Sequence, residues 1–344
     1  MRLETGVLVQ SDYRKRCGKI DAVLHCQSLA RWLFHGPLRL PSGAFYSWHA
    51  GDDSEFLYPE VAALALRLGI AMHHETGDQQ WQDLLTPSLS YLSSTVQDGV
   101  VQHRGAGWLF DTVLAWKALG DAKAAGIPGD YQHLIPVMEE KALEMIQQRQ
   151  STTVALPRRW STRFRPHLLK SIALLLLSAP SGNRANLLKT AGAELIFLQE
   201  EDGGFGPPSF RPAYLHAHAY ALEGLIMLCS TELSPLARPA FDKGLAFLAA
   251  QRCHAPGYPQ WENKPSHPIA ADVTAQACRL FLLQRPQKTK EAEGCFLALQ
   301  NLHLPESGYR YTSDNDHTNS WATIFAAQAY MMAARSTCDP EVLL

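Results

Sequence analysis

The feature that most constrains the fold is an internal repeat with a period of about fifty residues. Gln199, Gln251 and Gln300 are 52 and 49 residues apart, and each precedes a loop rich in glycine and aromatic residues. Weaker copies of the loop follow Gln97 and Gly43. Fixed-period self-similarity on this scale is typical of a fold built from repeated supersecondary units.

The repeated unit is predicted to be a pair of helices, because apolar residues recur every three or four positions through most of the chain. We expect twelve helices, and strands in less than about a tenth of the residues. The first helices of the six pairs are expected at 19–34, 78–95, 132–149, 184–199, 235–252 and 288–302. The second helices are expected at 59–73, 110–121, 166–178, 212–230, 268–284 and 317–335.

The second helices are predicted to be buried, because they are rich in alanine and leucine on most faces. Proline, which suits a first helical turn, lies near four of their starts, at Pro59, Pro166, Pro212 and Pro268. The first helices carry more charged residues. Six apolar helices inside six polar ones predict an all-α fold, an (α/α)6 toroid that forms a single domain over residues 1–344. An open superhelix of helix pairs is the competing layout.

Composition excludes several classes of protein. With 46% hydrophobic and 19% charged residues, the chain can bury a large core and is not disordered. The net charge of −2 disfavours a nucleic-acid binder. We expect no membrane span, because the apolar stretches are too short, and no signal peptide. Seven scattered cysteines without a C-x-x-C motif predict reduced thiols, a cytoplasmic location and no metal site.

In such a ring the inner helices run parallel, so their first turns meet at one end. Carboxylates, imidazoles, guanidinium groups and aromatic rings recur at those turns, which predicts an active site there. The expected catalytic residues are Glu60, Asp111, His218, Asp272 and His317. The expected substrate-binding residues are Tyr58, Trp108, Arg163, Arg165, His216, Tyr220, Trp261, Asn319 and Trp321. The competing interpretation is that Asp111 and Asp316 are helix caps and that the tryptophans belong to the core.

Two histidines of the fourth inner helix compete for the catalytic role. His216 and His218 are two positions apart, so they point about 200° apart and cannot easily chelate a metal together. His218 shares an apolar stripe with Ala221 and Leu225, where desolvation would keep an imidazole neutral. We therefore expect His218 to be the base and His216 to contact substrate.

The repeat resembles the glutamine–tryptophan repeat of squalene-type terpene cyclases and of protein prenyltransferase β subunits. Residues 189–205 carry the closest copy, and the resemblance implies an α/α toroid. The catalytic motifs of those families are mostly absent from this sequence. The segment 314–317 lacks the last aspartate of the cyclase Asp-x-Asp-Asp motif. Asp272 and Cys278 are six residues apart, whereas the prenyltransferase zinc ligands are two apart.

The sixfold toroid is also similar to sugar enzymes. N-acylglucosamine 2-epimerases have catalytic histidines on the inner helices of the fourth and sixth pairs, which correspond here to His216 or His218 and to His317. The toroid is also similar to unsaturated glucuronyl hydrolases and polysaccharide lyases, which use Asp, His, Tyr and Arg at the same end. Short sequence segments such as residues 319–323 resemble segments of toroid proteins of bacterial polysaccharide biosynthesis.

These observations favour a carbohydrate-active enzyme that acts on a sugar or a uronate-containing saccharide by acid–base catalysis, without a cofactor. The reaction can be epimerisation, elimination or hydrolysis. The substrate is expected to be a small molecule or an oligosaccharide, and the oligomeric state is left open. The alternative is an isoprenoid-handling, terpene cyclase-like toroid with Asp314 and Asp316 as its acid. A non-catalytic scaffold that binds a peptide is a third option.

Overall fold

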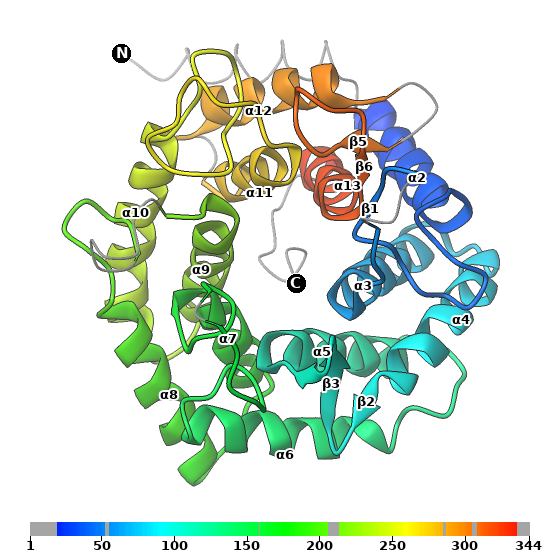
Figure 1. Ribbon diagram of the computed structural model, residues 1–344, viewed down its shortest axis with the longest axis vertical. Helices are drawn as coiled ribbons and strands as arrows, with labels where there is room; N and C mark the ends of the chain where they lie inside the picture. Colours follow the sequence, from blue (N-terminus) through cyan, green and yellow to red (C-terminus); the bar gives the residue numbers. More distant parts are fainter. Residues whose placement is uncertain are drawn as a thin grey trace, which may run out of the picture.

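A computed structural model describes residues 19–51, 55–157, 159–205, 213–284, 287–304 and 308–335. Its helices form a closed double ring (Figure 1). The inner helices are α3 (Pro59–Thr76), α5 (Leu109–Ala124), α7 (Leu169–Leu177, after the 3₁₀ turn η1, Pro166–Leu168), α9 (Leu215–Leu228), α11 (Ala271–Leu282) and α13 (Ser320–Ala334). The outer helices are α2 (Lys19–His35), α4 (Gln80–Ser94), α6 (Leu134–Gln147), α8 (Gly182–Ile196), α10 (Ser234–Ala250) and α12 (Thr289–Leu302).

The described part of the chain thus contains the twelve α-helices that the periodicity predicts, and the (α/α)6 toroid is confirmed. Pro59 and Pro166 occupy first helical turns, as expected from the fixed φ of proline. Pro268 lies three residues before α11, and Pro212 lies outside the described residues. None of the described helices is long and apolar enough to cross a membrane.

The helices pair differently from the sequence prediction. Each outer helix from α4 onward packs mainly against the inner helix that precedes it in the chain, as α4 does against α3 and α12 against α11. Short turns such as 77–79 join these partners, whereas a long connection such as 36–58 leads from an outer helix to the next inner helix. The predicted pairs were therefore wrong by one helix, although the inner and outer roles were right.

The ring closes between the two ends of the chain. Helix α2 packs principally against α13, where it completes the last helical pair. Strand β1 (Trp48–His49) is antiparallel to β6 (Thr318–Asn319), and Ser320 donates from its backbone N–H to the Ser47 carbonyl at 3.1 Å. An ion pair of 2.9 Å joins Arg335 to Glu75. These contacts exclude the open superhelix.

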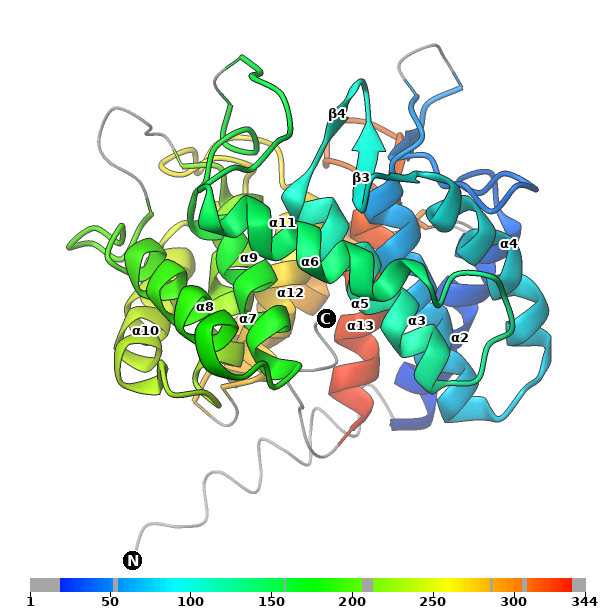
Figure 2. The same cartoon turned by 90° about the horizontal axis from the view of Figure 1, so that it is seen from below.

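The strands are short and belong to the long connections. One sheet has the order β1–β6–β5, with β5 at Tyr309–Arg310. The other has the order β2–β3–β4, formed by Val96–Gln97, Val100–His103 and Ala106–Gly107. Figure 2 shows the β3–β4 hairpin and the neighbouring loops at one end of the ring. This end is the one at which the inner helices begin.

Charged side chains are buried between four inner helices. The Lys170 ammonium donates to Glu223 Oε2 at 2.7 Å, and the Arg279 guanidinium donates to the other oxygen of the same carboxylate. Arg279 also donates to Gln328 Oε1 at 2.5 Å. All four side chains are almost wholly inaccessible to solvent. This Glu223 network joins α7, α9, α11 and α13 through the inside of the ring.

Helices α7 and α9 approach each other closely beside the network. A Cβ atom at Gly224 would lie 2.3 Å from the Leu169 carbonyl carbon and 2.4 Å from the Lys170 backbone nitrogen. Only glycine permits this contact. The neighbouring Glu223 is thereby held within reach of Lys170.

We expect Glu223→Gln to destabilise the fold by about 3–5 kcal/mol, because it leaves two buried cations without their anion. The free energy of unfolding from denaturant titration measures this loss. Glu194→Gln is the matched control, since Glu194 pairs with Arg149 on the surface and its loss should cost less than about 1 kcal/mol. Equal losses in the two variants would contradict the role assigned to the Glu223 network.

Candidate functional site

Glu60, in the first turn of α3, anchors the group of polar side chains at the inner-helix N-termini. Its Oε1 atom accepts a hydrogen bond from the Tyr220 hydroxyl at 2.5 Å and one from Trp321 Nε1 at 3.1 Å. Burial raises the pKa of Glu60, while the charges of His216 and Lys170 and the two hydrogen bonds act to lower it. Side chains of α3, α9 and α13 therefore converge on one carboxylate.

Asp111, in the first turn of α5, is a second buried carboxyl group near Glu60. Its pKa is raised well above the usual value by burial and then by the charge of Glu60. The Oδ2 atom is buried without a hydrogen-bond partner. Hydrogen bonds and the His216 charge act to lower the pKa of Glu60, whereas burial and the Glu60 charge both raise that of Asp111, so Asp111 holds a proton more readily than Glu60. Asp111 is thus not a helix cap but a buried acid with a free acceptor atom.

His216 and Asp272 form a third polar contact, between the first turns of α9 and α11. The His216 Nδ1 and Asp272 Oδ2 atoms lie 3.0 Å apart, and both side chains are more than 90% buried. Their angles do not satisfy a hydrogen bond, and Asp272 Oδ1 also lacks a partner. The His216 ring packs edge-on against Tyr220 at 4.7 Å between centroids, which connects this pair to Glu60.

His167 lies in the turn that leads into α7, next to Phe110 of α5. Its ring packs against Phe110 at 5.7 Å and edge-on against Trp160 at 5.2 Å between centroids. Burial lowers the pKa of His167 to about 3, and its Nε2 atom has no partner. Buried polar atoms are normally hydrogen-bonded. Unpartnered atoms on Asp111, His167 and Asp272 therefore indicate places for water or a polar ligand.

The structure contradicts the expected orientation of His218. Its Nε2 atom lies 3.0 Å from the Gly244 carbonyl oxygen, and its ring packs against Phe205 and Phe247. It therefore faces the outer helix α10, whereas His216 faces the inside of the ring. The prediction of His218 as the base does not fit this position, because the apolar stripe that carries His218 is the face that packs against the neighbouring helix.

Two more of the expected residues have other positions or roles. His317 is exposed in the loop before α13, not on an inner helix. Asn319 is the N-cap of α13, where its side chain accepts a hydrogen bond from the Ala322 backbone N–H at 2.8 Å. A capping role explains why this side chain is buried. Neither residue joins the group formed by Glu60, Asp111 and His216.

The acid expected for an isoprenoid cyclase also lies in the loop before α13. Asp314 is exposed and accepts a hydrogen bond from Thr312 Oγ1 at 2.6 Å. Asp316 pairs with Arg310 at 3.2 Å, and its side chain is 81% exposed. A carboxyl group in water has no strong driving force to protonate an alkene.

The remaining expected binding residues lie at the same end of the ring. The Tyr58 ring packs against Trp321 and His103, and Trp108 Nε1 donates to the His103 carbonyl oxygen at 3.0 Å. Trp261 is about one-third exposed in the connection before α11. Arg163 and Arg165 are half-buried in the connection before η1. Burial and then the charge of Arg163 lower the pKa of Arg165, so the two guanidinium groups lie near each other.

Sequence reasoning missed two residues of this end. His103 comes from β3, and burial followed by the charge of Arg104 lowers its pKa to about 4. Tyr311 shares a hydrogen bond with the Tyr214 hydroxyl, near Asp272. Both lie in long connections, where no helical period gives their position. The glycine–aromatic loop of the last repeat contains Tyr311 and was the available signal.

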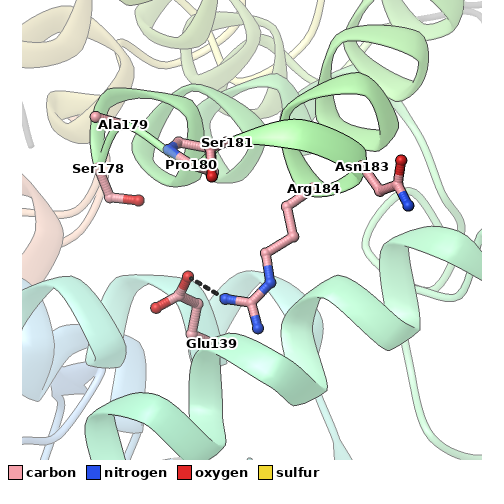
Figure 3. A pocket seen from close by; sticks show the side chains of 7 residues that line it. All are labelled: Glu139, Ser178, Ala179, Pro180, Ser181, Asn183 and Arg184. Atoms are coloured by element: carbon pink, nitrogen blue, oxygen red, sulfur yellow. Dashed lines mark ion pairs between the residues drawn. The ribbon is translucent and has the colours of Figure 1, made fainter.

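The opposite end of the ring has a cavity of about 440 Å³ between α6 and the start of α8 (Figure 3). Arg184 points across it towards Glu139, at 3.6 Å, and also pairs with Glu140. One guanidinium group thus faces two carboxylates here. Within the described ranges, no three or more His, Cys, Asp or Glu residues are grouped so that they could hold a metal ion.

No protein-family model and no curated protein matches the sequence. Solved structures share the fold. An unsaturated glucuronyl hydrolase specific for heparin superposes with a TM-score of 0.69 at 13% identity, over 94% of this chain and 97% of that one. A D-mannose isomerase superposes with a TM-score of 0.67 at 12% identity, over 98% of this chain and 100% of that one. The type II terpene cyclase MstE from Scytonema gives 0.64 at 11%, over 92% and 98%. The suspected resemblance to toroid enzymes is confirmed at the level of the fold.

His167 should make the protein sensitive to acid. The folded state holds this imidazole neutral down to about pH 3, whereas the unfolded state binds a proton near pH 6.5, so the contribution to stability falls as the pH drops below 6.5. Between pH 7 and pH 5 the free energy of unfolding should fall by about 2 kcal/mol less in His167→Phe than in the wild type. Denaturant unfolding at the two pH values measures the difference.

The control for this prediction is His133→Phe, because His133 is largely exposed at the start of α6. Its pH dependence should match that of the wild type. If His167→Phe and the wild type lose the same stability on acidification, the imidazole is not held neutral by burial.

Proposed function

We propose that the chain is an enzyme that acts on a sugar by acid–base catalysis at the inner-helix N-termini. The observation that carries the proposal is that a buried carboxyl group of raised pKa, on Asp111, and a buried imidazole, on His216, both lie close to Glu60 inside one ring of helices. Acid–base reactions of sugars require a donor and an acceptor of protons placed around the same ring. The buried atoms without partners supply the hydrogen bonds that sugar hydroxyls need.

Asp111 acts as the general acid. Burial and the neighbouring Glu60 charge raise the pKa of its carboxyl group well above the usual value, so this group can hold a proton and donate it to a sugar oxygen. His216 acts as the general base, with Asp272 at 3.0 Å to stabilise the imidazolium that forms. Tyr220 and Trp321 hold the Glu60 carboxylate by hydrogen bonds, so its charge stays beside Asp111 during the reaction.

This combination fits proton transfer next to a sugar carbonyl, as in isomerisation or epimerisation, and also fits β-elimination. Each of these reactions removes a proton from carbon and returns or delivers one to oxygen or carbon. The D-mannose isomerase and sugar epimerase among the structures of similar fold are consistent with the proposal. Hydrolysis is the second candidate, because Asp111 and Glu60 are two neighbouring buried carboxyl groups, and burial and the Glu60 charge raise the pKa of Asp111 well above its usual value.

Aromatic rings and cations complete the environment expected of a sugar site. Tyr58 and Trp321 pack against each other with 5.4 Å between centroids, next to Glu60, and the apolar face of a pyranose can stack on such rings. Arg163 and Arg165 lie at the same end of the ring of helices and can bind a carboxylate or stabilise an enediolate. Isoprenoid cyclisation is not proposed, because its expected acid is exposed to solvent.

The test incubates the protein with aldoses, ketoses, N-acylhexosamines and unsaturated uronate disaccharides in D₂O. Proton NMR detects deuterium at carbon for isomerisation or epimerisation, loss of a C–H signal for elimination, and new reducing ends for hydrolysis. We expect Asp111→Asn and His216→Asn each to lower turnover about a hundred- to ten-thousandfold.

His218→Gln is the matched control, because His218 faces α10 and should leave turnover within about threefold of wild type. Circular dichroism confirms that each variant is folded. Full turnover by Asp111→Asn, or a larger loss in His218→Gln than in His216→Asn, would refute the assignment of acid and base.

A further inference from the structure

A second pocket opens at the catalytic end of the ring, outside the group around Glu60. Its volume is about 270 Å³, slightly below the range that holds drug-sized ligands and suited to a single ring-sized group. The loops before α11 and α13 form its walls. The lining residues are Gln260, His267, Pro268, Tyr311, Thr312, Asp314 and Asn315.

The pocket adjoins the proposed active site. Tyr311, one of its walls, is hydrogen-bonded to the Tyr214 hydroxyl, and the charge of Asp272 acts on both rings. Tyr214 also packs against Trp261, with 4.9 Å between ring centroids, and Trp261 follows the pocket residue Gln260 in the chain. A ligand that contacts Asp272 can therefore extend past Tyr311 into the pocket.

Polar side chains in the pocket are held in place before any ligand arrives. Thr312 Oγ1 donates to Asp314 Oδ1 at 2.6 Å and accepts from Asn315 Nδ2 at 2.5 Å. Fixed donors and acceptors lower the entropy that ligand binding costs. The Gln260 and Asn315 amides can each donate and accept hydrogen bonds, as hydroxyl groups require.

The aromatic rings and the charged side chains near the pocket indicate which kind of ligand it can bind. The rings of Trp261 and Tyr311 offer apolar faces, and about one-third of the Trp261 surface is exposed. The Asp314 carboxylate repels an anion, whereas the guanidinium groups of Arg163 and Arg165 lie in another connection, before η1. The pocket therefore suits an uncharged sugar ring better than a uronate.

We propose that this pocket, with Trp261 at its edge, is a subsite for an uncharged sugar residue, so that the substrate is an oligosaccharide rather than a monosaccharide. The proposal rests on the proposed function. The reacting sugar lies between Asp111 and His216, and the next residue of the chain stacks on Trp261 and forms hydrogen bonds with Gln260 and Asn315. Specificity for chain length then depends on loops and not on the catalytic groups.

The experiment measures the binding of neutral trisaccharides (cellotriose, maltotriose, xylotriose and chitotriose) and of their monosaccharides to the full-length protein. Saturation-transfer NMR and calorimetric titration give the dissociation constants. We expect at least one trisaccharide to bind ten times more tightly than its monosaccharide. Trp261→Ala should remove about tenfold of that affinity, because a stacked ring is lost. Asn315→Ala should weaken binding severalfold.

Trp160→Ala is the matched control, because Trp160 is equally exposed at the same end but belongs to the connection before η1, which contributes no lining residue to the pocket. Its trisaccharide affinity should stay within about twofold of wild type. Equal binding of trisaccharides and monosaccharides, or equal losses in the two tryptophan variants, overturns the subsite and leaves the sugar-directed function standing. If no sugar binds while geranylgeraniol in detergent micelles does, the proposed function and the subsite both fail.

Discussion

The arrangement of the inner helices depends on the buried carboxylate of Glu223. Its two oxygens bind one cation each, from Lys170 on α7 and Arg279 on α11, and Arg279 continues to Gln328 on α13. Separation of these charges would leave them unpaired in a medium that solvates them poorly, so the network fixes each helix in rotation as well as in position. On α9 this decides which histidine faces the inside. His216 lies seven residues before Glu223, on the same stripe, and therefore points inward with it.

The same argument shows what the sequence could predict of the site and what it could not. Helical periodicity predicted twelve helices, and the all-apolar composition of every second helix predicted which ones are buried. That composition also hid the inward direction, because an inner helix packs on both sides and has no polar outer face. The expected base, His218, was placed on the apolar stripe, and that stripe contacts α10. The informative signal was the polar stripe of His216, Tyr220 and Glu223, which repeats on α11 as Asp272, Gln276 and Arg279.

The pairing of helices could not be fixed by the repeat itself. A period of about fifty residues is the same whether the polar or the apolar helix is counted first. The lengths of the connections decide which helices pair. The three-residue turn at 77–79 holds α3 against α4, whereas the long connection at 36–58 allows α2 to pack mainly against α13 rather than α3. The positions of loop residues such as His103 and Tyr311 could not be predicted from helical periodicity either. These long connections all lead to inner-helix N-termini, so residues without a helical register surround the proposed site.

The protonation of the proposed site follows from what lies beneath it. The Glu223 network contains two cations and one anion, and the Lys170 ammonium lies 4.7 Å from the centre of the Tyr220 ring. Tyr220 donates its hydroxyl proton to Glu60, on which the Lys170 charge also acts. The Lys170 charge thus acts to lower the pKa of Glu60, against the larger effect of burial, which raises it. Burial and the Glu60 charge both raise the pKa of Asp111, so Asp111 holds a proton more readily than Glu60. In the proposed mechanism the Glu223 network therefore acts on the acid of α5 through Glu60, and a change in that network is expected to alter the chemistry without changing any residue at the end of the ring.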